Sequence, residues 1–240
     1  NNLKKTSVSE HNSKLLYKSA TELKKLICAK KISPVEITQL VLNRIQEINP
    51  KTNAFLTVTA EQALRTARRV EKKILKGETV GLLAGIPTSI KDLEPMRDVR
   101  NTKGSLVFQD FIADVDQIAV ERIKNADGII VGKTNTPEFG SSGTTENKLG
   151  DDCRNPWNLK YVAGGSSGGA GASVASGITP IAQGSDGGGS IRIPSAFCGI
   201  YGIKGTQGRV PRRNVGLLNW HPVNYSCMGP MSRYVVDSAL

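Results

Sequence analysis

The chain has 240 residues, of which 38% are hydrophobic and 5% aromatic, which is enough for a globular protein with a buried core. No run of about 18 apolar residues occurs, which argues against a transmembrane helix, and residues 1–10 lack the apolar region of a secretory signal. The net charge of +11 would suit a nucleic-acid partner, but the basic residues are spread as pairs that we expect on solvated helix faces: Lys24-Lys25, Lys30-Lys31, Arg68-Arg69, Lys72-Lys73 and Arg212-Arg213.

Three helices are predicted after a polar tail at residues 1–18. Ser19 and Ser33 each begin a capping box, with a glutamate three residues later, and Pro34 suits a first helical position. The second helix should end at Asn49-Pro50, because proline disfavours a continuing helix. Thr59 should cap the third helix. The predicted helices span residues 20–30, 34–48 and 60–75, with a short strand at 54–58 and a stop at Gly77.

From Val80 onward the sequence changes to short apolar runs separated by glycine. Strands are predicted at 82–90 and 128–134, with a helix at 116–126 between them, and this alternation is typical of an α/β protein. We therefore expect a mixed β-sheet core covered by helices, in one domain over residues 19–240. The long polar segment 135–157 is expected to be a binding-site loop, since it lies between buried strands.

Two glycine-serine clusters dominate residues 164–206. Ser166 lies in GGSSGG and Ser190 lies in DGGGS, 24 residues further on. Between them lie a helix-like run at 172–177 and an apolar strand candidate at 178–184. Glycine at this density allows positive φ and lets backbone amides approach a ligand. Both clusters could therefore meet at one end of the sheet. Lys91 follows a β-like run directly, in the position where catalytic groups gather on α/β scaffolds.

The residue content limits the chemistry of such a site. The only histidines are His11, in the polar tail, and His221, with no aspartate close in sequence, so a Ser-His-Asp triad is disfavoured. If a serine is the nucleophile, its base should be another hydroxyl or a lysine, and Lys91 is the best placed. The four cysteines are widely spaced without a CxxC pair, which favours reduced thiols in a cytoplasmic protein over a zinc site.

Six blocks then occur in a fixed order: GIPTSIKDL, GKTNTPEFG, NPW, GGSSGGA, DGGGSIRIPSAFCG and KGTQGRVP. In this order, from about Ser19 to the last residue, the chain resembles the amidase signature family of serine hydrolases. The 75 residues from Lys91 to Ser166 and the 24 from Ser166 to Ser190 agree with the family's spacing. The resemblance implies that Ser190 is the acylated nucleophile, Ser166 a bridging serine preceded by a cis peptide, and Lys91 the terminal base.

Further residues receive supporting roles. The amides of Gly187, Gly188, Gly189 and Ser190 are expected to hold an oxyanion, because consecutive glycines leave their N–H groups accessible. By resemblance, Phe139 and Gly140 would line the acyl pocket. Ser167, Asp186 and Arg192 would support the catalytic serines. The mechanism requires no metal and no organic cofactor.

Each motif taken alone has a simpler interpretation. A lysine at a strand end is usually solvated, a GGSSGG run can be a flexible loop, and DGGGS can cradle a phosphate at a helix start. A P-loop is excluded because no GK[ST] follows either cluster. It is their joint occurrence at the family's spacing that favours a catalytic site.

The expected function is a stand-alone amidase that hydrolyses a small or aryl carboxamide. The expected partner is the amide substrate, and assembly into a homo-oligomer is to be tested. One alternative is the A subunit of a tRNA-dependent amidotransferase, which would give the positive charge a nucleic-acid context. TPEFG followed by GTTEN resembles stand-alone amidases more than that amidotransferase component. The other alternative is an inactive binding module. KGT replaces the family's usual KPT, and the chain stops where family members continue, so we expect a fold truncated at its carboxy-terminal side.

Overall fold

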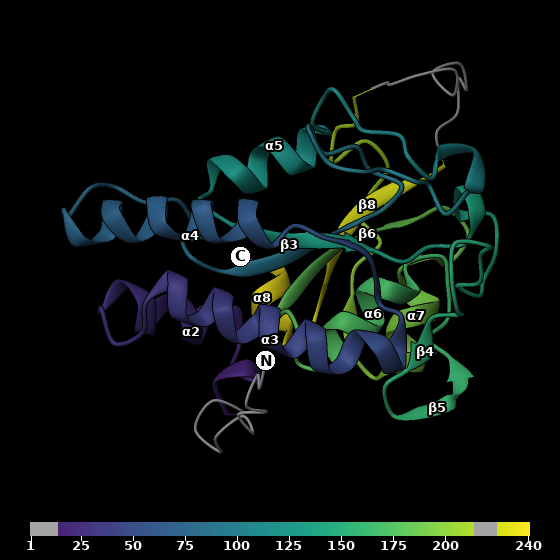
Figure 1. Ribbon diagram of the computed structural model, residues 1–240, viewed down its shortest axis with the longest axis horizontal. Coiled ribbons are helices and arrows are strands. Elements are labelled where there is room, and N and C mark those ends of the chain that lie inside the picture. The colour runs from purple at the N-terminus through teal and green to yellow at the C-terminus, as the bar shows by residue number, and fades with distance from the viewer. Residues whose placement is uncertain (1–13, 214–224) are drawn as a thin grey trace, which may run out of the picture.

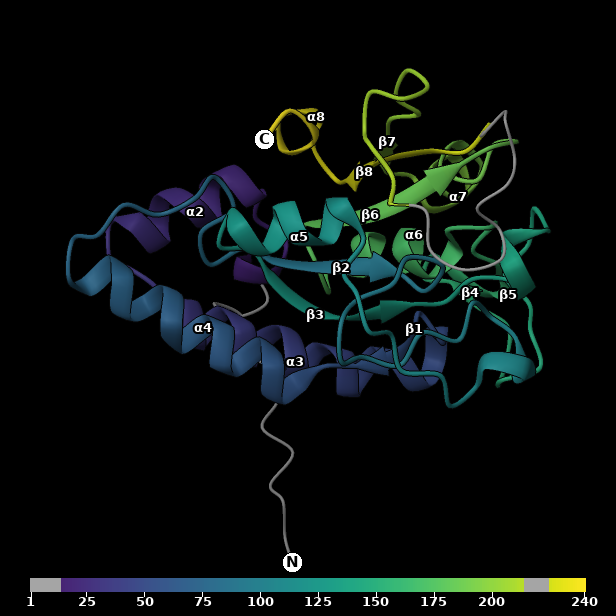
Figure 2. The same ribbon diagram turned by 90° about the horizontal axis from the view of Figure 1, so that it is seen from above.

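The computed structural model describes residues 14–213 and 225–240. The centre of the fold is a six-stranded mixed sheet (Figure 1). The strands are β1 (Phe55–Val58), β2 (Pro87–Lys91), β3 (Ile129–Thr134), β6 (Ile181–Asp186), β7 (Tyr201–Gly202) and β8 (Cys227–Ser232). Their order across the sheet is β1-β3-β2-β6-β8-β7. β2 is parallel to both of its neighbours, β3 and β6, as Figure 2 shows for β2 and β6, and the remaining pairs are antiparallel. A separate small hairpin pairs β4 (Arg154–Asn155) with β5 (Asn158–Val162).

Helices cover both faces of the sheet, which confirms the predicted α/β class (Figure 1). They are α2 (Ala20–Cys28), α3 (Pro34–Thr52), α4 (Ala60–Leu75), α5 (Ile118–Asn125), α6 (Gly168–Ala175), α7 (Arg192–Cys198) and α8 (Val235–Ser238), with short 3₁₀ turns η1 (Leu106–Phe108) and η2 (Glu138–Gly140). Ile129 and Val131 of β3 pack in a cluster with residues of α3, α4 and α6, whereas Ile130 packs with Val120 of α5. Alternate residues of a strand face opposite sides, so β3 anchors both layers.

Local signals predicted the amino-terminal helices well. In both capping boxes the serine hydroxyl accepts a backbone N–H, and the glutamate accepts a bond from the serine N–H. The predicted end of the second helix at Asn49-Pro50 is wrong, because α3 continues to Thr52 with Pro50 inside it. The Asn49 side chain pairs with both backbone groups of Phe55, and this contact with the start of β1 holds the last turn in place.

The third helix begins and ends as predicted, but its cap differs. Thr59 precedes α4 without making a side-chain cap bond. Its hydroxyl instead donates to the carbonyl of Ile130 at 3.0 Å, and its N–H donates to Val131 at 3.0 Å. Contact with the neighbouring strand therefore replaces the local cap that the sequence predicted.

The glycine-serine cluster at Ser166 leads directly into a helix. The sequence predicted helical structure only from residue 172, whereas α6 begins at Gly168. Glycine is a poor helix former, but a Cβ at Gly169 would collide with the backbone of Asn135 and Ala54. The Gly169 N–H also donates to the Asn135 carbonyl at 3.1 Å. Close packing on the segment after β3 thus requires glycine and starts the helix early.

The two central strands begin later than predicted. β2 starts at Pro87 because residues 82–85 form a turn, in which Gly85 has φ +76° and its N–H donates to Asp127. β6 starts at Ile181 and ends at Asp186. Lys91, which was predicted to follow its strand directly, is the last residue of that strand. In the described part of the chain, no helix has the length and apolar character needed to cross a membrane.

Candidate active site

Lys91 lies at the carboxyl end of β2, between β3 and β6, and is completely buried. Its Nζ atom is 2.7 Å from Ser166 Oγ and 3.2 Å from Ser185 Oγ. Its backbone N–H donates to the side-chain oxygen of Gln183 at 3.1 Å. The predicted lysine and bridging serine are therefore in direct contact, although 75 residues separate them.

The two glycine-serine clusters meet through Ser167. Its backbone N–H donates to the Ser190 carbonyl at 3.1 Å, and its hydroxyl donates to the Ser185 carbonyl at 3.1 Å. The peptide between Gly165 and Ser166 is cis. This arrangement ties the start of α6 to the end of β6 and to the turn that carries Ser190. Ser167 thus connects the segments that hold Ser166, Ser185 and Ser190.

Asp186 shapes the turn that presents Ser190. It ends β6, and its carboxylate accepts bonds from the N–H groups of Gly189 at 2.7 Å and Ile191 at 3.1 Å. Arg192 adds a bidentate ion pair at 2.9 and 3.0 Å. Burial alone would raise the pKa of Asp186, but the bonds from Arg192 and from the three backbone amides together lower it below its usual range. A permanent carboxylate therefore fixes the turn around half-buried Ser190.

This geometry divides the glycines that were expected to hold an oxyanion. Gly187 and Gly188 are exposed on the turn, next to Ser190. Gly189 is buried with φ +119°, a conformation that requires glycine, and its N–H is directed to Asp186. The Gly189 amide thus stabilises the turn in this structure through its bond to Asp186.

The two residues predicted to line the acyl pocket lie in η2 but differ in direction. A Cβ on Gly140 would lie 3.3 Å from Ser166 Oγ, so Gly140 borders the bridging serine. Phe139 is 47% exposed, and its ring contacts Phe108 edge-on with centroids 6.1 Å apart. Phe108 in turn contacts Phe111 at 5.9 Å. An aromatic group therefore lies beside the site, and its Phe108 and Phe111 members carried no sequence signal.

The surroundings of Lys91 favour its uncharged amine form. Burial is the main cause that lowers its pKa, from 10.5 to about 7. Among nearby charges, Glu94 raises the pKa, Arg212 lowers it, and Asp186 raises it. A lysine that is partly deprotonated near neutral pH can accept a proton from a hydroxyl at 2.7 Å. The arrangement can therefore activate a serine.

Several residues at the site were not expected from the sequence. Ser185 and Gln183 contact Lys91 from alternate positions of β6, and two polar residues at a period of two in a buried strand were the available signal. Arg212 was grouped with solvated basic pairs, but its guanidinium pairs with buried Glu94 at 2.9 Å. That contact spans 118 positions of the chain and had no local signal.

A second buried lysine lies next to Lys91. Lys133, on β3, donates to Asp92 at 2.9 Å, and both side chains are fully buried. Asp92 also accepts bonds from the N–H and hydroxyl of Thr102. Burial lowers the pKa of Lys133, while Asp92 raises it. Asp92 follows Lys91 directly in the chain, so this ion pair adjoins the end of β2.

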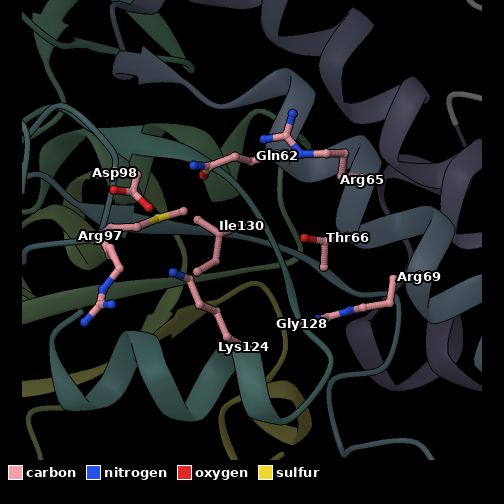
Figure 3. A pocket seen from close by; sticks show the side chains of 10 residues that line it. Gln62, Arg65, Thr66, Arg69, Arg97, Asp98, Lys124, Gly128 and Ile130 are labelled. Carbon is pink, nitrogen blue, oxygen red and sulfur yellow. The ribbon is translucent and has the colours of Figure 1, made fainter. Parts of the chain in front are cut away.

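A separate pocket of about 240 Å³ lies away from these serines (Figure 3). It is bordered by Gly128 and Ile130 near the start of β3, and by basic side chains that include Arg65, Arg97 and Lys124. Lys91 pairs instead with Thr134, at the other end of β3. The pocket contains none of the predicted site residues.

The described residues add neither a metal site nor a histidine to the candidate site. Within residues 14–213 and 225–240, no group of three or more His, Cys, Asp or Glu side chains could hold a metal ion. His11 and His221 lie outside the described residues. All four cysteines are unpaired.

A protein-family model described as Amidase matches residues 36–240. Curated relatives include the A subunit of the glutamyl-tRNA(Gln) amidotransferase of Carboxydothermus hydrogenoformans, 45% identical over 94% of this chain and 46% of that protein. An acylamidase of Rhodococcus erythropolis is 42% identical over 92% of this chain and 46% of that protein. A solved bacterial aryl acylamidase of the amidase signature family superposes with a TM-score of 0.89 at 39% identity, over 93% of this chain and 46% of that one. The chain thus spans about half the length of the curated relatives it matches.

Proposed function

Because the chain belongs to the amidase signature family, we propose that it hydrolyses a carboxamide C–N bond through an acyl group carried on Ser190. The observation that supports this most directly is the buried contact of 2.7 Å between Lys91 Nζ and Ser166 Oγ. The bond from Ser167 N–H to the Ser190 carbonyl places the second serine segment beside it. Proton acceptor, hydroxyl relay and nucleophile segment thus adjoin one another.

The proposed reaction begins with neutral Lys91. Lys91 takes the proton of Ser166 while Ser166 takes the proton of Ser190, and Ser190 Oγ forms a bond to the amide carbonyl carbon. Amides of the glycine turn, with Gly187, Gly188 and Ser190 as the candidates, stabilise the oxyanion. The relay returns the proton to the leaving nitrogen as the C–N bond breaks. Water then attacks the acyl-enzyme and releases the carboxylate and free Ser190.

The proposed substrate is a small or aryl carboxamide. The matches to an acylamidase and to an aryl acylamidase support this class. A cytoplasmic location is part of the same proposal, since four unpaired cysteines suit a reducing compartment.

The second candidate is the glutamine-hydrolysing component of a tRNA-dependent amidotransferase. It is favoured by the 45% identity to such a protein, which exceeds the 42% identity to the acylamidase. Both candidates use the same serines and lysine, and they differ in substrate and in their need for partner proteins.

Ammonia release from simple amides, aryl amides and glutamine, with and without the other amidotransferase components, separates these candidates. Turnover of simple or aryl amides by the protein alone supports the amidase. Release only from glutamine and only with partners supports the amidotransferase component. No release under any condition, with no acyl adduct, would leave a binding module as the remaining interpretation.

Mass spectrometry after treatment with a fluorophosphonate tests the residue assignment. The adduct should lie on Ser190, and Ser190→Ala should abolish it while the protein stays folded. An adduct on Ser166 would overturn the assignment of the nucleophile.

A further inference from the structure

Glu94 is a buried acidic residue in the turn that follows Lys91. It lies three positions further along the chain, and its backbone N–H donates to the Lys91 carbonyl at 3.0 Å, which closes a tight turn after β2. The residue is 1% exposed. One carboxylate oxygen accepts a bond from Arg212 at 2.9 Å, while the other, Oε2, is buried without a hydrogen-bond partner among the described residues. The carboxylate is therefore only half satisfied by its arginine.

Arg212 reaches Glu94 from residues 204–213, a segment that we call the strap. The next residue anchors the strap to the start of α5. Arg213 donates to Glu121 at 3.1 Å and to the Asp116 carbonyl at 3.2 Å, and its own carbonyl accepts from Gln117 at 3.1 Å. Arg212 is thus held over Glu94 by its neighbour, with its side chain 24% exposed.

The other charges close to Lys91 are already balanced. Asp92, directly after β2, and Lys133 on β3 form a buried pair at 2.9 Å. On β6, Asp186 is paired with Arg192 and three backbone amides. The turn and the strap contribute Glu94 and Arg212, whose effects on the pKa of Lys91 oppose each other. Unlike Asp186, whose two carboxylate oxygens are both bonded, Glu94 keeps Oε2 without a hydrogen-bond partner among the described residues.

We propose that Glu94 and Arg212 are positioning residues that adjust how readily Lys91 takes up a proton, Glu94 by favouring the ammonium form and Arg212 by restraining Glu94. The inference rests on the proposed role of Lys91 as base. It gives the strap a function in catalysis: a strap that is docked brings Arg212 over Glu94, and Lys91 then holds its proton less tightly. A base in a buried site needs such adjustment, because small changes of charge nearby have large effects there.

The test is the pH dependence of the rate at which a fluorophosphonate labels Ser190, measured on the full-length protein. The acid limb of this profile is the pH range in which the labelling rate falls as Lys91 takes up a proton. In Glu94→Gln the acid limb should move to lower pH by about one unit, because the charge that favours the ammonium form is gone. In Arg212→Met the limb should move to higher pH. Arg212→Lys, which keeps the charge, should restore the wild-type limb.

The ion pair that anchors the strap provides a second test. Glu121 of α5 and Arg213 of the strap pair through side chains that are 50% and 44% exposed. Glu121→Gln and Arg213→Gln leave Glu94 and Arg212 in place but loosen the strap that holds Arg212 over Glu94. Their acid limbs should therefore move to higher pH, in the direction of Arg212→Met but by less.

The outcomes separate the inference from the proposed function. Opposite shifts in Glu94→Gln and Arg212→Met, with partial return in the double variant Glu94→Gln/Arg212→Met, support the inference. Shifts in the same direction, or unmoved limbs in variants that remain folded by thermal unfolding, overturn it. If wild-type Ser190 is never labelled, the proposed function fails instead, and direct titration of Lys91 by NMR still decides whether the pair acts on it.

Discussion

Lys91 and Lys133 lie near the carboxyl ends of neighbouring parallel strands, β2 and β3, and both are fully buried. Burial lowers the pKa of both. Their partners differ: Lys91 Nζ contacts the hydroxyls of Ser166 and Ser185, whereas Lys133 Nζ contacts the carboxylate of Asp92. Two lysines in nearly the same place in the fold are thus given different neighbours.

We propose that the contact partner, and not burial alone, decides which of the two lysines acts as a base. Burial lowers the pKa of Lys133, but a carboxylate at 2.9 Å opposes this by favouring the ammonium form. Burial lowers the pKa of Lys91 to about 7, and the hydroxyls in contact with its Nζ atom carry no full charge to oppose it. The predictions below test this difference, from the largest expected effect to the smallest.

Replacing Lys91 by alanine removes the proposed base and should have the largest effect on the acylation rate. Loss of a general base should slow acylation of Ser190 by about two to four orders of magnitude. The measurement is the rate of fluorophosphonate labelling at pH 8. Lys91→Arg should not rescue the rate, because arginine stays protonated. A rate in Lys91→Ala equal to the wild type would refute the assigned role.

The same substitution at the two lysines should change stability in opposite directions. Lys133→Met leaves Asp92 as an uncompensated buried charge and should lower the free energy of unfolding by about 3–5 kcal/mol. Lys91→Met removes a lysine that must lose its proton to be buried, and should raise the free energy of unfolding at neutral pH. Urea unfolding at pH 7 measures both.

The double variant Asp92→Asn/Lys133→Met sharpens that result. With the carboxylate neutralised, much of the stability lost in Lys133→Met should return, since the penalty belongs to the unpaired charge. Equal destabilisation of the single and double variants would mean that packing, and not charge, decides the role of Lys133.

The pH dependence of wild-type acylation should report Lys91 alone. Below about pH 7 Lys91 is protonated, so the labelling rate should fall about tenfold per unit, and above pH 7 it should level off. Stability should follow the same group: its folded pKa lies below 10.5, so the unfolded chain binds more protons and the free energy of unfolding should rise between about pH 7 and 10.5. A labelling rate independent of pH from about 5.5 to 9 would contradict the role of Lys91 as the titrating base.

Ser185→Ala tests the weaker of the two hydroxyl contacts. Loss of one hydrogen bond of about 0.5–1.5 kcal/mol should change the labelling rate by a factor of roughly 2 to 12. Ser173→Ala is a matched control, since Ser173 is a buried serine that pairs with Thr179 instead of Lys91. If Ser185→Ala slows labelling as strongly as Ser166→Ala, then Ser185 is part of the proton relay itself.

Much of the fold could be predicted because the signals are local. The capping boxes at Ser19 and Ser33, and the apolar run that forms β3, act over a few residues and were interpreted correctly. The errors arose where a distant contact overrides a local preference. Asn49 bonds to Phe55 across the helix end, Thr59 bonds to Ile130, and packing on Asn135 starts α6 within the glycines.

By itself, the sequence determined the α/β class, most element positions and the choice of Lys91, Ser166 and Ser190 as candidates, since motif order and spacing are properties of the chain. The tertiary structure alone decided which lysine meets hydroxyls and which meets a carboxylate, that Ser185 faces Lys91, and that Arg212 covers Glu94. These contacts join residues between 41 and 118 positions apart. They depend on strand register and on the course of the strap, because a pKa in a buried site responds to the few charges and hydroxyls within reach, wherever in the chain they originate.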